Sequence, residues 1–431
     1  MKLRIIIAIL AVTISSNLFS QKKYTLDDCK KLTETRNINL KNSDLDVLSA
    51  AQTSKEAYTK YFPEIKGSAF GFKNSRSVVS MDIGGLQVNT LKSGLTGGIT
   101  AIQPIYTGGN ISNSNKLAKL GEEVSKYQKE ITKNDVLLET EKSFWLLASL
   151  MDKLETIHTI ENHLNALLKK VESSVAAGTT ITNDILKVKL KINETIALKS
   201  KTTNAMTLCK MSLCQQMGLS LDSIQTFDII VPDFIHIESP AIYYVVHESV
   251  MYDRPEYRIL DKGITASKLE TKIKQSEYLP TVSIGANYGY DNFSNRNHMS
   301  GTIFATVSIP LSDLWGGSYA IKKQKIKEQI AYNKYEQGKQ LLLLEMKQVQ
   351  NDFDESYRQV NIAKSAIAQS IENLRLYNNY LAAGTTEISQ VLDAESMLSQ
   401  SQNNYTDACI NYYINKAKYL QVTNNHSALT R

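Results

Sequence analysis

Histidine and cysteine side chains are the groups in this chain that could bind a metal or support catalysis. His158 and His163 lie five residues apart in a segment expected to be helical, so their side chains point to different faces. No cysteine lies near them, whereas a zinc site needs three or four convergent ligands. We interpret both as ordinary polar surface or packing residues. The other histidines are scattered along the chain: His236, His247, His298 and His426.

The sequence contains no recognisable catalytic or cofactor-binding motif. The segment Thr107-Gly108-Gly109-Asn110 lacks the Gly-Lys-Ser/Thr ending of a phosphate-binding loop and is typical of a joint between a strand and a helix. No nucleophile can be paired with a base, which argues against an exported hydrolase. We predict that the protein is not an enzyme and has no catalytic residue, metal or cofactor.

The four cysteines are Cys29, Cys209, Cys214 and Cys409. Cys209 and Cys214 are five residues apart in an expected helix and point to different faces, so a disulfide between them is not expected. Cys29 could pair with Cys214 in an oxidising compartment if the helix ends that carry them meet. Buried free thiols are the interpretation that we favour.

The first 20 residues have the features of a secretory signal peptide. Lys2 and Arg4 precede an apolar run over residues 5–14, and Ser20 is a small residue suited to cleavage. The run is about half of the ~20 residues that a membrane-spanning helix requires, so removal is expected rather than anchoring. No cysteine follows the run, which argues against a lipidated amino terminus.

Composition excludes several classes of protein. A chain of 431 residues with 42% hydrophobic residues, 20 Gly and 7 Pro is not a collagen, a disulfide-stapled miniprotein or a polytopic helical membrane protein. A net charge of +6 is too small and too dispersed to indicate a nucleic-acid partner. These averages suggest a soluble protein, and the pattern of the sequence has to decide whether that holds for every part.

Two halves of the chain carry the same landmarks in the same order, which indicates an internal duplication. The segment 176–180 (Ala-Ala-Gly-Thr-Thr) recurs letter for letter 206 residues later, and the same offset carries Pro104 onto Pro310. A second pair of landmarks, 217 residues apart, is Tyr61-Phe62-Pro63 and Tyr278-Leu279-Pro280. The two offsets differ by 11 residues, so the first copy has an insertion between its two prolines, where we expect a loop.

Each copy shows the same succession of periodicities. The first is expected to contain a helix over about 26–61, a strand hairpin at 62–106, a long helix over about 111–174, a turn at 176–180 and a returning helix to about 217. The second is expected to contain a helix over about 242–278, a hairpin at 279–310, a long helix over about 319–382, a turn at 382–386 and a returning helix to about 422. The domains are therefore 1–20 (signal peptide), 21–217 (first repeat), 218–240 (linker or equatorial segment) and 241–431 (second repeat).

Proline and glycine mark the boundaries of these elements. Proline ends the first helix of each copy, because it disfavours a helical conformation in the preceding residue. The pairs Gly108-Gly109 and Gly316-Gly317 are expected to turn the backbone out of extended geometry after the strands. At the repeated turns glycine ends one helix and threonine is expected to cap the next. Helices of roughly sixty residues reach about 90–100 Å, which no compact domain needs.

The expected strands have one apolar and one small, polar face. A soluble sandwich edge would also alternate, but strands of about ten residues beside such long helices favour a membrane-spanning barrel with a wet lumen. Aromatic residues cluster at the helix side of the strands, where an interfacial girdle would lie. They are Trp315, Tyr106, Tyr61, Phe62 and Tyr278. Four strands cannot close a barrel, and open edges are not tolerated in lipid, so three copies with twelve strands are expected.

This succession of elements resembles the TolC-like outer-membrane efflux proteins. The resemblance rests on the Tyr-Phe-Pro and Tyr-Leu-Pro joins, the prolines that end the returning strands, the two Gly-Thr turns and the run Val391-Leu392-Asp393-Ala394. It implies an α+β membrane protein in the outer membrane of a Gram-negative bacterium, with most of its mass in the periplasm. The implied assembly is a homotrimer with a 12-stranded β-barrel continued by a long periplasmic α-helical barrel.

The same resemblance implies an exit duct of a tripartite efflux or type I secretion system. Its partners would be a periplasmic adaptor protein and an inner-membrane transporter, and it would pass small molecules or proteins to the exterior. The alternative is a periplasmic coiled-coil structural protein without channel activity, which would not explain two hairpins of alternating strands at matched positions.

Site residues follow from the resemblance as well. The helix tips that would contact the adaptor are Gly178, Thr179, Gly384 and Thr385. The positions that would close the periplasmic entrance are Leu381, Thr386, Gln390 and Asp393, where relatives have Tyr, Arg, Asp and Asp. Only the last keeps the family residue, so three such carboxylates could form one ring that attracts cations; the alternative is a solvated surface aspartate. Asp184 in the first copy occupies the position that matches Gln390 and could supply the acidic contribution instead.

Overall fold

The computed structural model describes residues 22–75, 79–83, 86–90, 93–231, 237–292, 297–311 and 314–424. The predicted signal peptide lies outside these residues. The chain divides into two compact units, each with residues from both predicted repeats. We call the described residues of 44–129 and 255–340 the sheet unit, and the described residues of 22–43, 130–254 and 341–424 the helical unit. No helix among the described residues is both long enough and apolar enough to cross a membrane.

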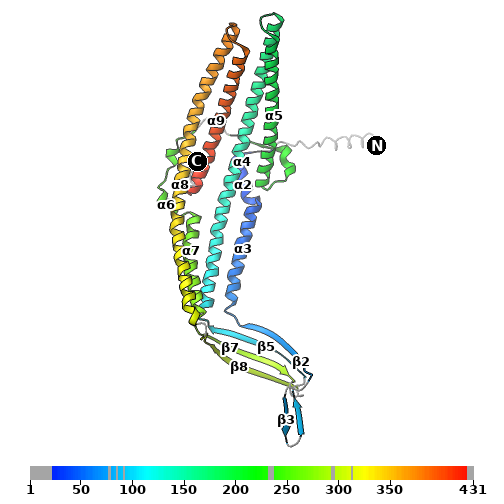
Figure 1. Ribbon diagram of the computed structural model, residues 1–431, viewed down its shortest axis with the longest axis vertical. Helices are drawn as coiled ribbons and strands as arrows, with labels where there is room; N and C mark the ends of the chain where they lie inside the picture. The colour runs from blue at the N-terminus through cyan, green and yellow to red at the C-terminus, as the bar shows by residue number, and fades with distance from the viewer. Residues whose placement is uncertain are drawn as a thin grey trace, which may run out of the picture. The chain divides into compact units, whose positions relative to one another are not determined.

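Four antiparallel strands form one sheet in the sheet unit, in the order β2-β5-β7-β8 (Figure 1). Their bounds are Glu64–Lys73 (β2), Ser93–Tyr106 (β5), Thr281–Asp291 (β7) and His298–Ser308 (β8). The central pairing of β5 with β7 joins the two predicted hairpins and places Ile99 opposite Tyr288. Strands β2 and β8 are the edges, so the described strands make an open sheet.

The insertion predicted as a loop contains a hairpin of its own. Strands β3 (Val79–Ile83) and β4 (Leu86–Thr90) pair with each other between β2 and β5. The expectation of a loop is therefore wrong for these residues. Both strands contain β-branched residues, which fit extended structure, and the short distance between them along the chain favours a hairpin.

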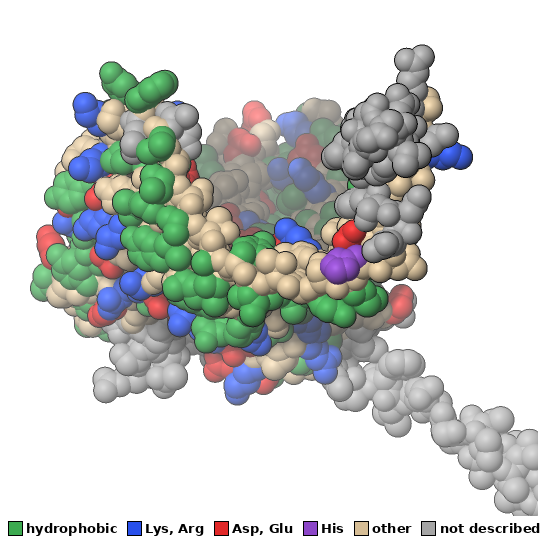
Figure 2. Space-filling view, turned by 90° about the horizontal axis from the view of Figure 1, so that it is seen from below, with side chains coloured by type: hydrophobic (Ala, Val, Ile, Leu, Met, Phe, Trp, Pro, Cys, Tyr) green, Lys and Arg blue, Asp and Glu red, His purple; other side chains and the backbone are tan. Residues whose placement is uncertain are grey.

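The strand register confirms the predicted separation of apolar and polar faces. One face carries the apolar side chains of all four strands: Ile65, Ala69, Leu95, Ile99, Ala101, Val282, Ile284, Ala286, Tyr288, Tyr290, Met299, Ile303, Ala305 and Val307. Ile303 on this face is 88% exposed. Hydrophobic side chains gather along the strands in the view from below (Figure 2). A large apolar face that the protein itself leaves uncovered indicates contact with lipid or with another chain.

The opposite face of the sheet is mainly polar, and its aromatic rings are Phe70 and Phe72 of β2 and Phe304 of β8. Asn287 donates a hydrogen bond to Thr100 on this face, with 2.7 Å between Nδ2 and Oγ1. Phe304 points to the same side from β8, directly opposite Gly285 of β7. A Cβ atom at Gly285 would lie 2.4 Å from Cζ of Phe304, so the ring occupies space that only glycine leaves free.

Two of the predicted helices are broken into shorter ones. The predicted helix over 26–61 is broken at Asn37 into α2 (Leu26–Arg36) and α3 (Ile38–Thr59), because the Asn37 side chain accepts from the Asn39 amide and donates to Gln216 O. The predicted helix over 242–278 is replaced by η2 (Pro240–Tyr243), α6 (His247–Met251) and α7 (Pro255–Ser276). Proline favours the first turn of a helix and restricts the residue before it, so α7 begins at Pro255.

The two glycine pairs do not play the same role. Gly108 and Gly109 have φ of 63° and 88° and form the predicted joint before α4 (Asn110–Ala176). Gly316 and Gly317 do not turn the chain, because α8 (Leu314–Ala382) has already begun. A Cβ atom on Gly317 would lie 2.6 Å from the ring of Tyr278, so this glycine permits a close contact inside the sheet unit.

The helical unit is built on the distal parts of α4 and α8 with two returning helices, α5 (Thr182–Gln216) and α9 (Ile388–Val422) (Figure 1). Helices α4 and α8 have 67 and 69 residues. The predicted linker contributes η1 (Leu221–Thr226) and β6 (Phe227–Ile229), which pairs in parallel with β1 (Lys22–Tyr24).

An apolar core lies where the returning helix α5 meets β6 and α4. Trp145 is buried there and stacks on Tyr413, with 4.3 Å between ring centroids. Cys29 and Cys214 are in the same core, and all four cysteines are buried and free, as favoured from the sequence. Burial raises the pKa of the Cys29 thiol to about 12, so it is protonated and unreactive at neutral pH.

Candidate functional site at the helix turns

The two Ala-Ala-Gly-Thr-Thr segments form the same backbone turn. Gly178 and Gly384 have φ of 73° and 70°, the left-handed conformation that glycine adopts without strain. After α4 the amide of Thr179 donates to Ser174 O (2.9 Å). After α8 the amide of Thr385 donates to Tyr380 O (2.9 Å). Both turns therefore have the six-to-one hydrogen bond of a Schellman motif, and glycine ends each helix as predicted.

The threonine hydroxyls form hydrogen bonds with the end of the preceding helix, not with the start of the following one. The hydroxyl of Thr179 donates to Ser174 O (2.9 Å), and that of Thr385 donates to Tyr380 O (3.1 Å). The N-caps of α5 and α9 are Ile181 and Glu387, neither with a side-chain capping bond. The expectation that threonine caps the returning helix is therefore wrong. Gly178, Thr179, Gly384 and Thr385 are all exposed and leave both turns open to a partner.

Apolar packing holds the helix ends together below the turns. Leu164 and Val171 of α4, Val188 of α5, and Ile388 and Leu392 of α9 form one buried cluster. Leu381 is half-buried against this cluster and against a second one. The second cluster consists of Leu374, Val391 and Ala394. Within one protomer, Leu381 is thus a packing residue.

Asp184 is neutralised inside the protomer. Its carboxylate accepts a hydrogen bond from the Thr180 hydroxyl (2.6 Å) and pairs with Lys187 (3.3 Å), and its side chain is only 14% exposed. Lys187 also donates to Ser389 of α9 (3.0 Å), which ties the two turns together. Little of the Asp184 charge is therefore available to a passing ion.

Asp393 and Gln390 lie on the exposed side of α9, and Thr386 is half-buried at its start. Among the residues that the structure describes, Asp393 makes no ion pair. Two positions further along, Glu395 is buried and its Oε1 lies 3.3 Å from Nδ1 of His163. Burial raises the pKa of Glu395, and His163 opposes that rise. His163, which we predicted to be an ordinary polar surface or packing residue, thus contacts Glu395, and the sequence did not reveal this partner.

Further polar contacts connect α4 with α9. Lys153 Nζ lies 2.6 Å from Asp407, and Thr406 donates to Asp152. Near the carboxyl end of α9, Gln421 donates to Asp135 (3.2 Å). The numbers rise along α4 as they fall along α9, so the two helices are antiparallel. These contacts join residues more than 250 positions apart, which no local pattern of the sequence could reveal.

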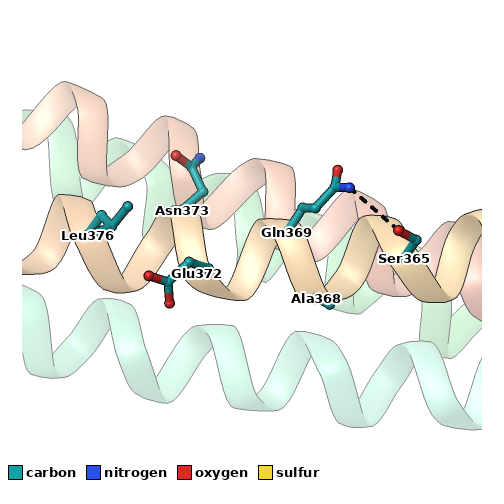
Figure 3. A pocket seen from close by; sticks show the side chains of 6 residues that line it. All are labelled: Ser365, Ala368, Gln369, Glu372, Asn373 and Leu376. Atoms are coloured by element: carbon teal, nitrogen blue, oxygen red, sulfur yellow. Dashed lines mark hydrogen bonds between the residues drawn. The ribbon is translucent and has the colours of Figure 1, made fainter.

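A shallow groove of about 500 Å³ runs along α8 before its turn (Figure 3). Its lining residues are Ser365, Ala368, Gln369, Glu372, Asn373 and Leu376. Ser365 and Ala368 have small side chains, which leave space above the helix at this end of the groove. The side-chain amide of Gln369 donates to the Ser365 hydroxyl (3.5 Å). Glu372 is held by Arg375, with contacts of 2.6 and 2.8 Å.

The predicted aromatic girdle belongs to the sheet unit. Trp315, Tyr106, Tyr61 and Phe62 are exposed at strand ends, with Trp315 the most exposed at 84%. Tyr278 is half-buried against Gly317. Two further rings were not predicted. The ring of Tyr58 contacts those of Tyr61 and Phe62 with centroid distances of 5.5 and 5.7 Å, and Tyr319 is exposed near Trp315 along α8.

No group of three or more His, Cys, Asp and Glu side chains that could hold a metal ion occurs in the described part of the chain. The hollow between α3, α4 and the sheet, about 950 Å³, is lined mainly by polar and small residues such as Asn110, Ser114 and Thr53. It lies on the polar side of the sheet, because Glu64, Ile102 and Ser283 belong to that face.

Comparison with known proteins found one matching family model and several solved structures with a similar fold. Residues 261–424 match the family model described as outer membrane efflux protein. No curated protein sequence matches the chain. The fold, in contrast, is shared with several solved structures.

Three of these structures are outer-membrane or membrane proteins of bacteria. The CmeC outer membrane channel of Campylobacter jejuni has a TM-score of 0.80 at 12% identity, over 92% of this chain and 85% of that one. The outer membrane protein VceC of Vibrio cholerae has 0.77 at 15% identity, over 92% and 95%. A membrane protein from Pseudomonas aeruginosa has 0.78 at 14% identity, over 92% and 93%.

Proposed function

Since residues 261–424 match the outer membrane efflux protein family, and the chain has the fold of outer-membrane channels, we propose that this protein is the outer-membrane exit duct of an efflux system. The observation that carries the proposal is the joining of an exposed apolar sheet face to helices of 67 and 69 residues. The strands lie in the outer membrane and the long helices extend into the periplasm. The family consists of channel proteins rather than enzymes.

The duct is a homotrimer. Among the described strands, β2 and β8 each have a neighbouring strand on one side only, and such open edges are not tolerated in hydrocarbon. Three protomers that pair β2 with β8 of the next copy close a barrel of twelve strands, large enough for a wet lumen. The polar face with Asn287 and Thr100 lines that lumen, and the face with Ile303 contacts lipid.

The protomer is an internal duplication, with a signal peptide at 1–20, repeats at 21–217 and 241–431, and a linker at 218–240. Support comes from the two Schellman turns, which share their glycine, threonine and hydrogen bonds. In each repeat two strands of the four-stranded sheet are followed by a long helix, the repeated turn and a returning helix.

The exposed turns at Gly178-Thr179 and Gly384-Thr385 contact a periplasmic adaptor, which connects the duct to an inner-membrane transporter. The groove on α8 lies just before the second turn along the helix and would receive a helix of that adaptor.

Asp393 is the residue best placed for an acidic ring at the entrance. It is exposed and has no ion-pair partner among the described residues, whereas Asp184 is compensated by Lys187.

The test is to purify the mature chain from membranes in detergent and measure its mass and its conductance in planar bilayers. We expect a heat-sensitive trimer that conducts ions. A monomer that stays soluble without detergent and does not conduct would contradict the proposal and favour the coiled-coil structural alternative.

A further inference from the structure

An exposed stripe of two aromatic and two cationic residues runs along the first turns of α8. Trp315 and Tyr319 are 84% and 73% exposed, and Lys322 and Lys323 are exposed as well. With 3.6 residues per turn, the first three lie within an arc of about 60° on one helix face. Nζ of Lys322 lies 5.8 Å from the ring centroid of Tyr319. The four residues, which we call the α8 stripe, thus form one continuous surface.

Three apolar residues at and beyond the end of β8, a few positions before the α8 stripe, are exposed. Val307, Ile309 and Leu311 have 62%, 56% and 68% of their surface accessible. Along the chain, exposed side chains therefore change from aliphatic to aromatic to cationic. A membrane protein shows this order from the hydrocarbon edge through the interface to the headgroups, because aromatic rings favour the interface and lysines extend towards the phosphates.

The positive charge beside the α8 stripe is not compensated. Lys322, Lys323, Lys325 and Lys327 lie within six positions, and none of them pairs with an acid in the described part of the chain. The next acidic residue along α8, Glu328, accepts a hydrogen bond from Thr271 of α7 (3.0 Å).

The first half of the chain repeats part of this charge. The offset of 206 residues that relates Pro104 to Pro310 also relates Lys116 to Lys322 and Lys119 to Lys325. Lys116 and Lys119 are exposed near the start of α4, in the same unit of the structure. Four matched lysines in each protomer follow the strands at the same distance along the chain.

We infer that the α8 stripe binds the headgroups of anionic phospholipids at the edge of the membrane. The inference rests on the proposed outer-membrane location. Uncompensated lysines match a phosphate-bearing headgroup in charge, and adjacent exposed rings match the interface in polarity. A second copy of this chain is the competing occupant, and it would cover Trp315 and shield it from lipid.

Tryptophan fluorescence can test the inference, because the chain has only two tryptophans. Trp145 is buried in the core of the helical unit, so quenching by lipids that carry bromine on their acyl chains reports on Trp315. The mature protein would be reconstituted in phosphatidylcholine vesicles. Part of that lipid would be replaced by brominated phosphatidylglycerol or, at the same mole fraction, by brominated phosphatidylcholine. Trp315→Phe should abolish the quenching and so verify its source.

We expect stronger quenching by brominated phosphatidylglycerol, with local enrichment of about five-fold for each lysine at low salt. High salt should remove the excess, because it screens charges at the surface. The double variant Lys322→Gln/Lys323→Gln should lose the part of the excess that these two lysines contribute but keep the quenching by phosphatidylcholine. Lys364→Gln is the matched control: this lysine is exposed on the same helix but lies in the helical unit, so its loss should change nothing.

Equal quenching by the two lipids, unaffected by the lysine variants, would overturn headgroup binding. Absence of quenching by either lipid would overturn contact with lipid and indicate that another chain covers the stripe. Both results can be obtained with protein that still conducts ions, so failure of this inference is distinguishable from failure of the proposed function.

Discussion

Gly285 shows, at the scale of single residues, how the polar face of the sheet can hold an aromatic ring. The Phe304 ring fills the space above this glycine, and it is the one aromatic exception in the alternation of β8. Alternation alone predicts the face of every residue in β8, but it gives no reason for a phenylalanine among threonines. The reason is the missing side chain on the neighbouring strand.

The variant Gly285→Ala should therefore lower stability by about 1–3 kcal/mol, because the new Cβ displaces the ring. The midpoint temperature of unfolding in detergent measures this effect. Gly67→Ala is the control, since a Cβ there meets nothing within 4 Å. The double variant Gly285→Ala/Phe304→Ala should show favourable coupling. Equal midpoints for Gly285→Ala and Gly67→Ala would contradict the assignment.

A second prediction for a single residue concerns Glu395 and the pH dependence of folding stability. Its carboxyl is buried, which raises its pKa in the folded state above the ordinary 4.5. Between these two pKa values the folded state binds more protons than the unfolded state, so stability falls as pH rises through that window. Glu395→Gln should remove this decline. Urea midpoints measured from acid to neutral pH test it.

Glu372→Gln is the control for this pH dependence. Hydrogen bonding to Arg375 lowers the pKa of the exposed Glu372, so its contribution has the opposite sign and is weakened by solvent screening. Parallel stability curves for the wild type and Glu395→Gln would show that Glu395 is not responsible.

At the scale of elements, helix ends are set by glycine conformation and by proline. Gly178 and Gly384 adopt positive φ with open space around them, so an alanine there meets backbone strain alone. We expect Gly178→Ala and Gly384→Ala each to cost about 1–2 kcal/mol, and Asn to cost less because it tolerates this conformation. Unfolding in urea provides the measurement.

Gly121 is the matched control for these glycines. It lies inside α4, and a Cβ atom added there would meet nothing within 4 Å, so Gly121→Ala should stabilise the protein by up to about 1 kcal/mol. A loss of stability in this control, or none at the two turns, would contradict the assigned roles.

At the scale of the whole molecule, the proposed trimer requires that the two sheet faces meet different surroundings. Ile303 and Thr302 are neighbours on β8 with opposite directions. Ile303→Lys places a charge on the lipid face and should cost about 2–4 kcal/mol near the membrane midplane. Thr302→Lys places it in the wet lumen and should be tolerated. The yield of heat-sensitive trimer separates the two, and equal yields would argue against the proposed barrel.

The acidic ring is a second prediction for the assembled trimer. Asp393→Asn removes three exposed carboxylates and should reduce both cation preference and block by divalent ions in single-channel recordings. Asp184→Asn should have little effect on either property, because its charge is compensated by Lys187. Unchanged selectivity in Asp393→Asn would leave this residue as a solvated surface aspartate.

The sequence by itself determined the features that depend on local periodicity. The strand faces, the long helices and the glycine turns follow from the spacing of residues that are neighbours along the chain. The place of the extra 11 residues could be inferred from the two offsets, whereas their hairpin could not. The helix breaks at Asn37 and Pro255 were not predicted from the sequence. The break at Asn37 depends on a hydrogen bond to the distant Gln216. The break at Pro255 lies in a segment whose overall composition favours helix.

Only the tertiary structure decided which residues act together. The Glu395–His163 contact, the links between α4 and α9 and the neutralisation of Asp184 depend on helices that meet after the chain has turned back. The tertiary structure also distinguished the exposed Asp393 from the packed Leu381. Both were predicted to close the periplasmic entrance, and the sequence offered no reason to prefer one of them. The physical reason is that burial and charge compensation belong to the space around a side chain, and that space is filled by residues distant in sequence.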